Sequence, residues 1–338
     1  MKKSVVFPAA FLFLACVAAH TQSLGEFAKE EQKRREEIPI DRTTTLIIEP
    51  KLMSATATGE KRLIEEDDEI YDNPQRVAAK PHFDRAKLFI YQGNLDAAIK
   101  ENTEAIRLDP DYASAYLNRG VTYIEKGDYS SGIADYNQAI RINPDFAIAY
   151  YNRGNALSNK SVYDQAIADY TQAIRLNPND ADAYFGRGLA YEKKRDYDQA
   201  IADYTQAIRI NPRYVAPYVN RARAYHNGKN DYDRAIADNN QAIRLDPDFE
   251  IPYLNRGIAY HRKGDYDQAI ADYTQAIRIY SAFAEAYIKR GNAYENKKDY
   301  DLAIMDYETV LLIDSNNVSA KKNLANARRL KERQPGYK

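Results

Sequence analysis

The chain has 338 residues, and its 48 Lys and Arg side chains nearly balance 49 Asp and Glu, for a formal net charge of -1. Proteins that hold nucleic acid electrostatically carry a basic excess, so this balance gives no support for a nucleic-acid partner. The single cysteine excludes an intramolecular disulfide framework and a cysteine-based zinc site.

The first residues have the pattern of an export signal, which we assign to residues 1–19. Lys2 and Lys3 form a basic start, and residues 5–15 form an apolar run too short to cross a bilayer. The stretch FLFLAC resembles a bacterial lipoprotein signal, which predicts cleavage before Cys16 and lipidation of that residue, although Phe13 replaces the usual leucine. The alternative is ordinary cleavage after residues 17–19, which discards Cys16. Both alternatives predict an exported protein, in the periplasm, anchored to the inner or outer membrane, or at the cell surface.

Residues 20–78 differ in composition from the rest of the chain. They are densely charged, and residues 65–69 read EEDDE. Such acidic runs are usually solvated, so we predict a largely disordered linker. A segment that folds onto a partner is the alternative.

From residue 79 the chain is an array of repeats. The stretch DYDQAIADYTQAIR occurs at residues 196–209 and again at 265–278, and Arg-Gly steps recur 34 residues apart, with one extra residue across Arg221-Ala222. A fixed period of this length indicates stacked helical units. Seven repeats are predicted, at residues 79–112, 113–146, 147–180, 181–214, 215–249, 250–283 and 284–317.

Each repeat holds two helical patterns. The first helix places a glycine, such as Gly120, opposite a small residue of the second helix, such as Ala200, and we expect the two helix axes to approach closely there. Asp196 followed by Gln199 predicts a capping box. The closing Asn-Pro or Asp-Pro steps suit the first turn of the next helix. Two repeats end instead in residues 280–281 and 314–315, where we expect the helices to run on.

The period, with Tyr, Gly, Ala and Pro at these offsets, resembles the tetratricopeptide repeat (TPR) family over residues 79–317. The resemblance implies an all-α fold, a right-handed α-solenoid of seven helix-turn-helix repeats. Residues 318–338 add a capping helix and tail, in which Val318, Leu324, Ala325 and Ala327 would cover the last repeat.

In this family the first helices line a ligand groove, so the resemblance implies a peptide-binding site at the corresponding positions. Its residues are Leu117, Asn118, Tyr151, Asn152, Asn155, Phe185, Asn220, Arg223, Leu254, Asn255, Arg262 and Asn292. An asparagine side chain can both donate to and accept from an extended peptide backbone. The alternative is that these asparagines bond their own neighbouring helices and tie adjacent repeats together. Some TPR domains clamp a C-terminal carboxylate with lysines next to such asparagines, but those positions here hold Leu117, Tyr151, Phe185 and Val219, so that mode is rejected.

An arginine recurs in the first helix of each repeat, and an acid follows sixteen residues later. The arginines are Arg119, Arg153, Arg187, Arg221, Arg256 and Arg290, and the acids are Asp135, Asp169, Asp203, Asp238, Asp272 and Asp306. Arg85 is matched by Glu101, so the signs persist where the residue type changes. We predict a structural ladder of ion pairs within each repeat, because an unpaired buried charge is costly. The alternative is an arginine row that binds an anionic ligand.

No constellation of catalytic residues is found in the sequence. His226 and His261 share one position in adjacent repeats, but no further metal ligands converge on them. The carboxylates repeat along the chain, whereas an active site needs a unique arrangement. We therefore predict a non-enzyme without cofactor or metal, a scaffold that binds unidentified protein partners in the cell envelope and meets the membrane only through a lipid anchor. The alternative is a surface-exposed or secreted adhesin-like binding protein.

Overall fold

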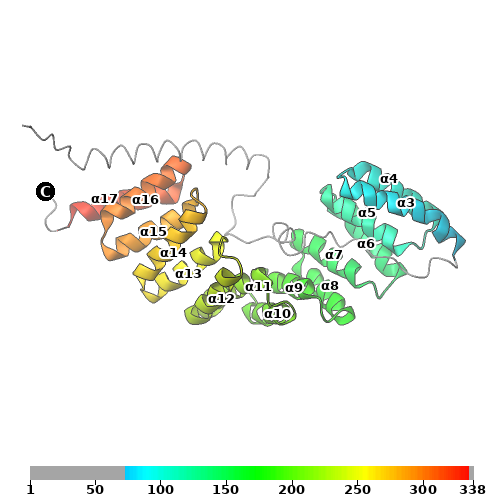
Figure 1. Cartoon of the computed structure of the whole chain (residues 1–338), viewed down its shortest axis with the longest axis horizontal. Helices are drawn as coiled ribbons and strands as arrows, with labels where there is room; N and C mark the ends of the chain where they lie inside the picture. Colours follow the sequence, from blue (N-terminus) through cyan, green and yellow to red (C-terminus); the bar gives the residue numbers. More distant parts are fainter. Residues whose placement is uncertain (1–72, 335–338) are drawn as a thin grey trace, which may run out of the picture. The chain divides into compact units, whose positions relative to one another are not determined.

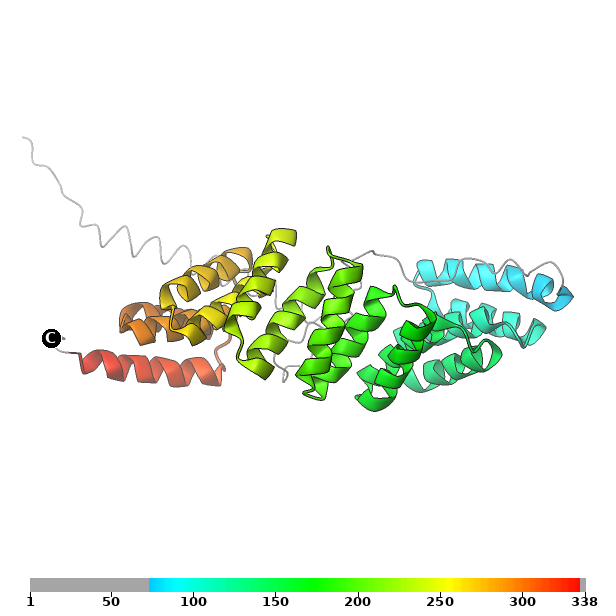
Figure 2. The same ribbon diagram turned by 90° about the horizontal axis from the view of Figure 1, so that it is seen from below.

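The computed structural model describes residues 73–334, so the predicted export signal, Cys16 and residues 20–72 of the linker lie outside the described residues. Within this range every regular element is helical, which confirms the predicted all-α class (Figures 1 and 2). The helices are α3 (Pro74–Tyr91), α4 (Leu95–Leu108), α5 (Ala113–Glu125), α6 (Tyr129–Ile142), α7 (Ala147–Asn159), α8 (Tyr163–Leu176), α9 (Ala181–Lys193), α10 (Tyr197–Ile210), α11 (Val215–Ala224), η2 (Tyr225–Lys229), α12 (Tyr232–Leu245), α13 (Glu250–Lys263), α14 (Tyr266–Ile279), α15 (Ala284–Lys297), α16 (Tyr300–Ile313) and α17 (Val318–Glu332).

The described residues divide into two compact units. One holds α3 to the π-helical turn η2, and the other holds α12 to α17. The boundary falls between Lys229 and Asn230, at the extra residue noted in the sequence. Within each unit, each helix packs against the next helix in the chain, as an α-solenoid requires. None of the described helices is long and apolar enough to cross a membrane.

The first helix begins earlier than the predicted start of the array at residue 79. Asn73 caps α3, because its side-chain oxygen accepts from the backbone N–H groups of Gln75 and Arg76 at 2.9 and 3.3 Å. Pro74 occupies the first turn, where a missing N–H is tolerated. The helical part of the chain therefore includes residues 74–78, so the predicted linker ends earlier than residue 78.

The predicted capping boxes are half formed. The Asp196 carboxylate accepts from the backbone N–H of Gln199 at 3.3 Å, and Asp265 does the same for Gln268. The backbone N–H of Asp196, however, donates to the carbonyl of Tyr191 at 2.9 Å. Because the backbone N–H of Asp196 already donates to the preceding helix, it is not available to donate to the side chain of Gln199, as a full capping box would require.

The prolines between repeats lie in turns, and not in the first turn of the following helix as expected. Asp109 ends α4 in an extended conformation, and the N–H of Tyr112 donates to its carbonyl at 3.1 Å. Pro110 is thus the second residue of a β-turn, a position that its fixed φ angle favours.

The two repeats without this proline end at the same place as the others, so the expectation that their helices run on is wrong. Tyr280 ends α14 with φ -128° and ψ 96°, and the N–H of Phe283 donates to its carbonyl at 3.1 Å. At the end of α16, Asp314 makes the same turn with Asn317. The backbone bond of the turn, rather than the proline, closes each repeat.

Close approach of the two helices depends on a glycine and a tyrosine. A Cβ atom added to Gly257 would lie 2.7 Å from Cε1 of the buried Tyr273 and 3.2 Å from the carbonyl oxygen of Ala269. The small residue of the second helix is thus part of the contact, as predicted, but the tyrosine ring is nearer. The two repeats with alanine at the glycine position, Ala86 and Ala222, are those in which asparagine replaces this tyrosine. The two positions vary together.

Helix α17 covers the last repeat, as expected, but with a different face. Leu324 and Ala327 pack on Ala303 and Tyr307. Val318 is 78% exposed and Ala325 is also exposed, so their predicted contacts are wrong. Ala320, Leu324 and Ala327 follow the i, i+4, i+7 spacing of one helix face, from which Val318 and Ala325 point away.

Candidate peptide-binding surface

The predicted ion-pair ladder is present within the described units. In five repeats the arginine makes two parallel hydrogen bonds to the aspartate, with Nη2–Oδ1 distances of 2.6–2.7 Å and Nε–Oδ2 distances of 2.8–2.9 Å. The pairs are Arg119–Asp135, Arg153–Asp169, Arg187–Asp203, Arg256–Asp272 and Arg290–Asp306. Arg221 and Asp238 belong to different units, so their pairing stays a prediction.

Each ladder arginine also contacts the preceding repeat, which sequence analysis missed. Its Nη1 donates to a threonine or asparagine oxygen on the preceding second helix, and its guanidinium lies 5.4–5.9 Å from a tyrosine ring three residues earlier. The acceptors are Thr103, Asn137, Thr171, Thr205, Asn240 and Thr274. The sequence pattern that could have predicted these bonds is a Thr or Asn that recurs sixteen residues before each ladder arginine. Because these bonds engage the guanidinium groups, the alternative of an anion-binding arginine row has no support.

The aspartates of the ladder are buried, and their charge depends on the arginine. Burial raises the pKa of Asp272 above its ordinary value, and the hydrogen bonds from Arg256 offset only part of that rise. The pKa values of Asp203 and Asp306 are raised for the same reason. The hydrogen bond to Asp272 in turn raises the pKa of Arg256. The arginine therefore stabilises a carboxylate that the interior disfavours.

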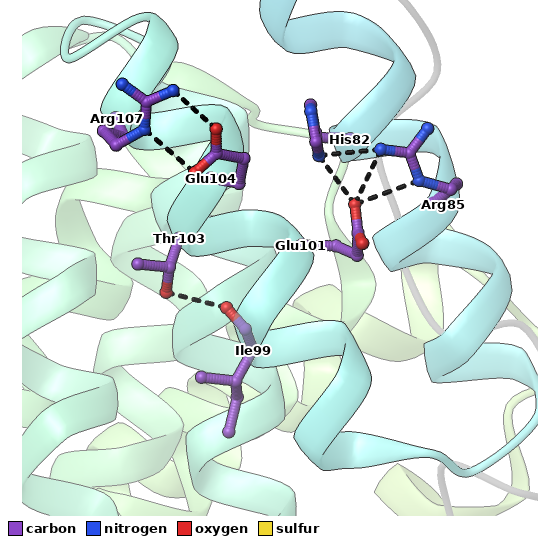
Figure 3. A network of polar contacts seen from close by, with 7 residues as sticks. All are labelled: His82, Arg85, Ile99, Glu101, Thr103, Glu104 and Arg107. Carbon is purple, nitrogen blue, oxygen red and sulfur yellow. Dashed lines mark hydrogen bonds and ion pairs between the residues drawn. The ribbon is translucent and has the colours of Figure 1, made fainter.

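The first repeat keeps the ion pair with other residues (Figure 3). His82 takes the place of the stacked tyrosine, and its Nδ1 lies 2.7 Å from Oε2 of Glu101. Arg85 donates from Nε to the same carboxylate oxygen at 3.0 Å, and its Nη2 lies 2.7 Å from Nδ1 of His82. Burial alone would raise the pKa of Glu101, but the hydrogen bonds from His82 and Arg85 outweigh it and lower the pKa. The predicted pairing of signs is confirmed here.

Five of the predicted binding residues are buried. Leu117, Asn118 and Asn220 are 0% exposed, Leu254 is 2% exposed and Phe185 is 3% exposed. The Phe185 ring packs 5.7 Å from the ring of Tyr204 and 5.3 Å from that of Tyr214. These side chains lie inside the stack of helices, so in this conformation they cannot touch a ligand.

The buried asparagines differ in their hydrogen bonding. Asn220 donates to the carbonyl of Ala216 on its own helix at 2.9 Å. The amide atoms of Asn118 and Asn102, in contrast, have no hydrogen-bond partner among residues 73–334. Asn220 is thus buried and bonded within its own helix, not to a neighbouring helix as the alternative expects, and Asn118 is neither bonded to a neighbouring helix nor accessible.

Arg223, another predicted binding residue, is engaged by a neighbouring repeat. Its Nε and Nη2 donate to the two carboxylate oxygens of Glu192 at 2.7 and 3.1 Å, and Nη2 also donates to Asn220. The hydroxyl of Tyr204 donates to Glu192 at 2.7 Å. Sequence analysis missed Glu192 as the partner because the pair is 31 residues apart, outside the sixteen-residue period of the ladder. The same spacing joins Asn326 to Glu295 and Asn323 to Asn292.

The remaining predicted residues are accessible. Arg262 is exposed, and Tyr151, Asn152, Asn155, Asn255 and Asn292 are half-buried. The side-chain oxygen of Asn155 accepts from the hydroxyl of Tyr170 at 2.7 Å. Asn292 accepts from Asn323 at 3.0 Å and from the Tyr307 hydroxyl at 2.8 Å, and the single proton of that hydroxyl is shared with Glu295 at 3.0 Å. The NH2 groups of Asn155 and Asn292 have no partner among the described residues. A tyrosine thus fixes each amide and leaves an oriented donor.

His261 contacts an asparagine and a tyrosine. Its Nε2 lies 2.7 Å from Nδ2 of Asn296, and its ring meets Tyr266 edge-on with centroids 5.2 Å apart. Burial lowers the pKa of His261. No group of three or more metal-ligating side chains occurs between residues 73 and 334.

Comparison with known proteins gives matches along the array. Models described as tetratricopeptide repeat match residues 151–215 and 284–317, and one described as TPR repeat matches residues 86–127, 122–161, 229–264 and 259–298. No curated protein sequence matches the chain.

Several solved structures share the fold. The C-terminal part of a TPR repeat-containing protein from Cytophaga hutchinsonii aligns with a TM-score of 0.60 at 20% identity, over 72% of this chain and 99% of that one. A tetratricopeptide repeat protein from Parabacteroides merdae gives 0.55 at 20% identity, over 75% and 99%. PilF of Pseudomonas aeruginosa gives 0.55 at 18% identity, over 62% and 95%. At these identities the similarity establishes the fold.

The fold is that of a helical-repeat scaffold for protein–protein interaction. Its helices are paired, its repeats are joined by periodic contacts, and its first helices are partly accessible. The chain belongs to the tetratricopeptide repeat family.

Proposed function

We propose that this protein holds an extended or helical segment of a partner protein along the first helices of its repeats, in the bacterial cell envelope. The observation that supports the proposal best is the pair of oriented amide donors. Asn155 and Asn292 each have their side-chain oxygen held by a buried tyrosine, and each presents its NH2 group at a half-buried position. A donor fixed before binding loses little side-chain entropy on capture of a peptide carbonyl.

The neighbours of these donors suit a peptide. Tyr151 and Asn152 lie one turn before Asn155 on α7, and both are half-buried. Ile288 lies one turn before Asn292 on α15 and is also half-buried. Each amide therefore has an apolar side chain beside it that can contact a partner side chain, the combination by which extended peptides are recognised.

Site-specific photo-crosslinking in cells tests this proposal. A photoreactive amino acid at Tyr151 or Ile288 is expected to trap one defined protein, and the matched positions Gln165 and Gln268, exposed on second helices, are expected to trap none. Asn155→Leu should reduce the adduct at Tyr151 without changing thermal stability by more than a few degrees. Equal adducts at all four positions, or none at the first-helix positions, would contradict the proposal.

The export signal supports placement in the envelope, and Cys16 supports a lipid anchor. Mass spectrometry of the mature N-terminus tests both. A diacylglyceryl-modified Cys16 is expected, whereas a free N-terminus near His20 would contradict the anchor, and an intact Met1 would contradict export. Protease treatment of intact cells then separates the two faces of the envelope, because rapid cleavage would indicate display at the cell surface.

A further inference from the structure

Two buried asparagines near the start of the array have no hydrogen-bond partner. Asn102 on α4 and Asn118 on α5 are each 0% exposed, and the oxygen and nitrogen atoms of both amides are unpaired among residues 73–334. Water satisfies such groups in the unfolded chain, so burying them without partners opposes folding. Buried polar groups in native proteins are almost always bonded to protein atoms or to ordered water. These two amides therefore require a partner.

The two amides lie next to each other across the joint between the first and second repeats. Helix α4 packs against α5. Two repeats further along the chain, the residues equivalent to Asn102 and Asn118 are Tyr170 and Gly186. A Cβ atom added to Gly186 would lie 2.9 Å from Cζ of Tyr170 and 3.2 Å from its hydroxyl oxygen. The side chain of Asn118 thus extends toward the space that a tyrosine at position 102 would fill.

The side chains of the first repeat fill less of this space than those of other repeats. Asn102 has half as many non-hydrogen side-chain atoms as the tyrosine that five other repeats have, and Ala86 adds a single methyl group where those repeats have glycine. Tyr204, one of these tyrosines, donates from its hydroxyl to Glu192 of its own repeat. The residue equivalent to Glu192 is the buried Ile90, which has no polar side-chain atom. The first repeat therefore cannot satisfy the amides as the tyrosine repeats satisfy their hydroxyl.

The other repeat that lacks the tyrosine has a similar feature. Asn239 is 1% exposed, its Nδ2 donates to the carbonyl of Ala235 at 2.9 Å, and its Oδ1 has no partner among the described residues. Asn220, in contrast, occupies the position of Asn118 but lies beside a tyrosine, and both of its amide atoms are bonded. Unpaired amides thus coincide with the loss of the tyrosine.

We propose that α4 and α5 enclose a binding site for an internal water molecule, held between the side chains of Asn102 and Asn118. A water molecule donates and accepts hydrogen bonds, so it can donate to the oxygen of one amide and accept from the NH2 group of the other. It needs little space, and buried waters typically make about three hydrogen bonds to groups that are otherwise unsatisfied. The water takes the place of the tyrosine ring and forms a polar joint between the first two repeats.

Magnetic relaxation dispersion of oxygen-17 water tests the site, because it detects water molecules that stay bound for longer than the protein takes to tumble. The full chain is compared with the double variant A86G/N102Y, which installs the glycine–tyrosine pair of the other repeats. This pair should fit, since Tyr204 and Asn220 lie together at the equivalent positions. The dispersion amplitude is expected to fall by the contribution of one water molecule, because the ring displaces it. Arg107→Ala, an exposed substitution on α4, should leave the amplitude unchanged. Equal amplitudes in the wild type and the double variant would overturn the proposal.

A high-resolution crystal structure of the full chain is the second measurement. It should show a water molecule within hydrogen-bond distance of a polar atom of each amide. A direct bond between Asn102 and Asn118 without such a water would overturn the proposal. An Asn102 side chain turned to donate to the carbonyl of Ala98, as Asn239 does on its own helix, with no water present would also overturn it. Neither measurement depends on a partner protein, so both are independent of the crosslinking at α7 and α15.

Discussion

Arg256 and Asp272 face each other across the two helices of one repeat, joined by hydrogen bonds of 2.6 Å from Nη2 to Oδ1 and 2.8 Å from Nε to Oδ2. The same guanidinium donates to Asn240 of the preceding repeat and lies 5.6 Å from the ring of Tyr253. One side chain thus joins two helices of its own repeat to a third helix. The array is held together by such joints as well as by apolar packing.

Arg256→Met should destabilise the protein by roughly 3–5 kcal/mol, because it leaves the buried Asp272 carboxylate without a partner. Urea denaturation followed by circular dichroism measures the loss. Lys263→Ala, on the same helix, removes an exposed pair with Asp233 and should change the free energy of unfolding by about 1 kcal/mol or less. Equal effects of the two substitutions would contradict a buried, energetically important ladder.

The loss in free energy of unfolding caused by Arg256→Met, relative to wild type, should decrease as the pH falls. The pKa of Asp272 is raised in the folded state, and removal of Arg256 takes away hydrogen bonds that lower it. A carboxyl whose folded pKa exceeds its unfolded value binds a proton more readily when folded, so acid favours the folded state until the pH is below both values. The difference in urea midpoint between wild type and variant should therefore narrow between pH 7 and pH 4. In the double variant R256M/D272N, the deficit should not narrow in this range, because no carboxyl remains at position 272 to take up the proton.

Gly257→Ala should cost about 1–3 kcal/mol, since its methyl group would lie 2.7 Å from the buried Tyr273 ring. Tyr273→Asn should cost more, because it leaves a cavity. The double variant reproduces the combination that the chain itself uses at Ala86 and Asn102, so its loss should be smaller than the sum of the two single losses. Thermal unfolding of the wild type, the two single variants and the double variant measures the coupling between the two positions. A loss in the double variant equal to the sum of the single losses would contradict this coupling.

Leu324→Ala should destabilise the C-terminal repeat by about 2–5 kcal/mol, because Leu324 packs on Ala303 and Tyr307. Amide exchange should quicken first in α16 and α17, since repeat arrays open from their ends. Val318→Ala removes apolar atoms from the same helix at a position that is 78% exposed, and should stay within about 0.5 kcal/mol of wild type. Uniform loss of protection from α12 to α17 would show instead that this unit unfolds as one.

The repeats and the ladder were predictable because their signals are periodic. The strongest evidence for the ladder in the sequence was the first repeat, where Glu101 replaces the usual aspartate and keeps the negative charge opposite Arg85. The binding surface was less predictable. A first helix has one side toward the preceding repeat and another toward solvent, and Asn118 and Asn152 occupy the same repeat position although Asn118 is buried and Asn152 is half-buried. Their burial depends on the neighbouring side chains, which no single repeat contains.

Helices α10 and α14 have the same fourteen-residue sequence, and each joint between repeats draws its donors and acceptors from fixed positions. A crossover between the two coding stretches would excise two whole repeats, including the one with η2 and the extra residue, and would leave the flanking joints with their usual partners. The length of this protein is thus open to change by recombination without redesign of the arginine joints, although Glu192 would lose its partner Arg223. Strains of the source organism should differ in repeat number by whole units, while α3 and α17 remain at the ends.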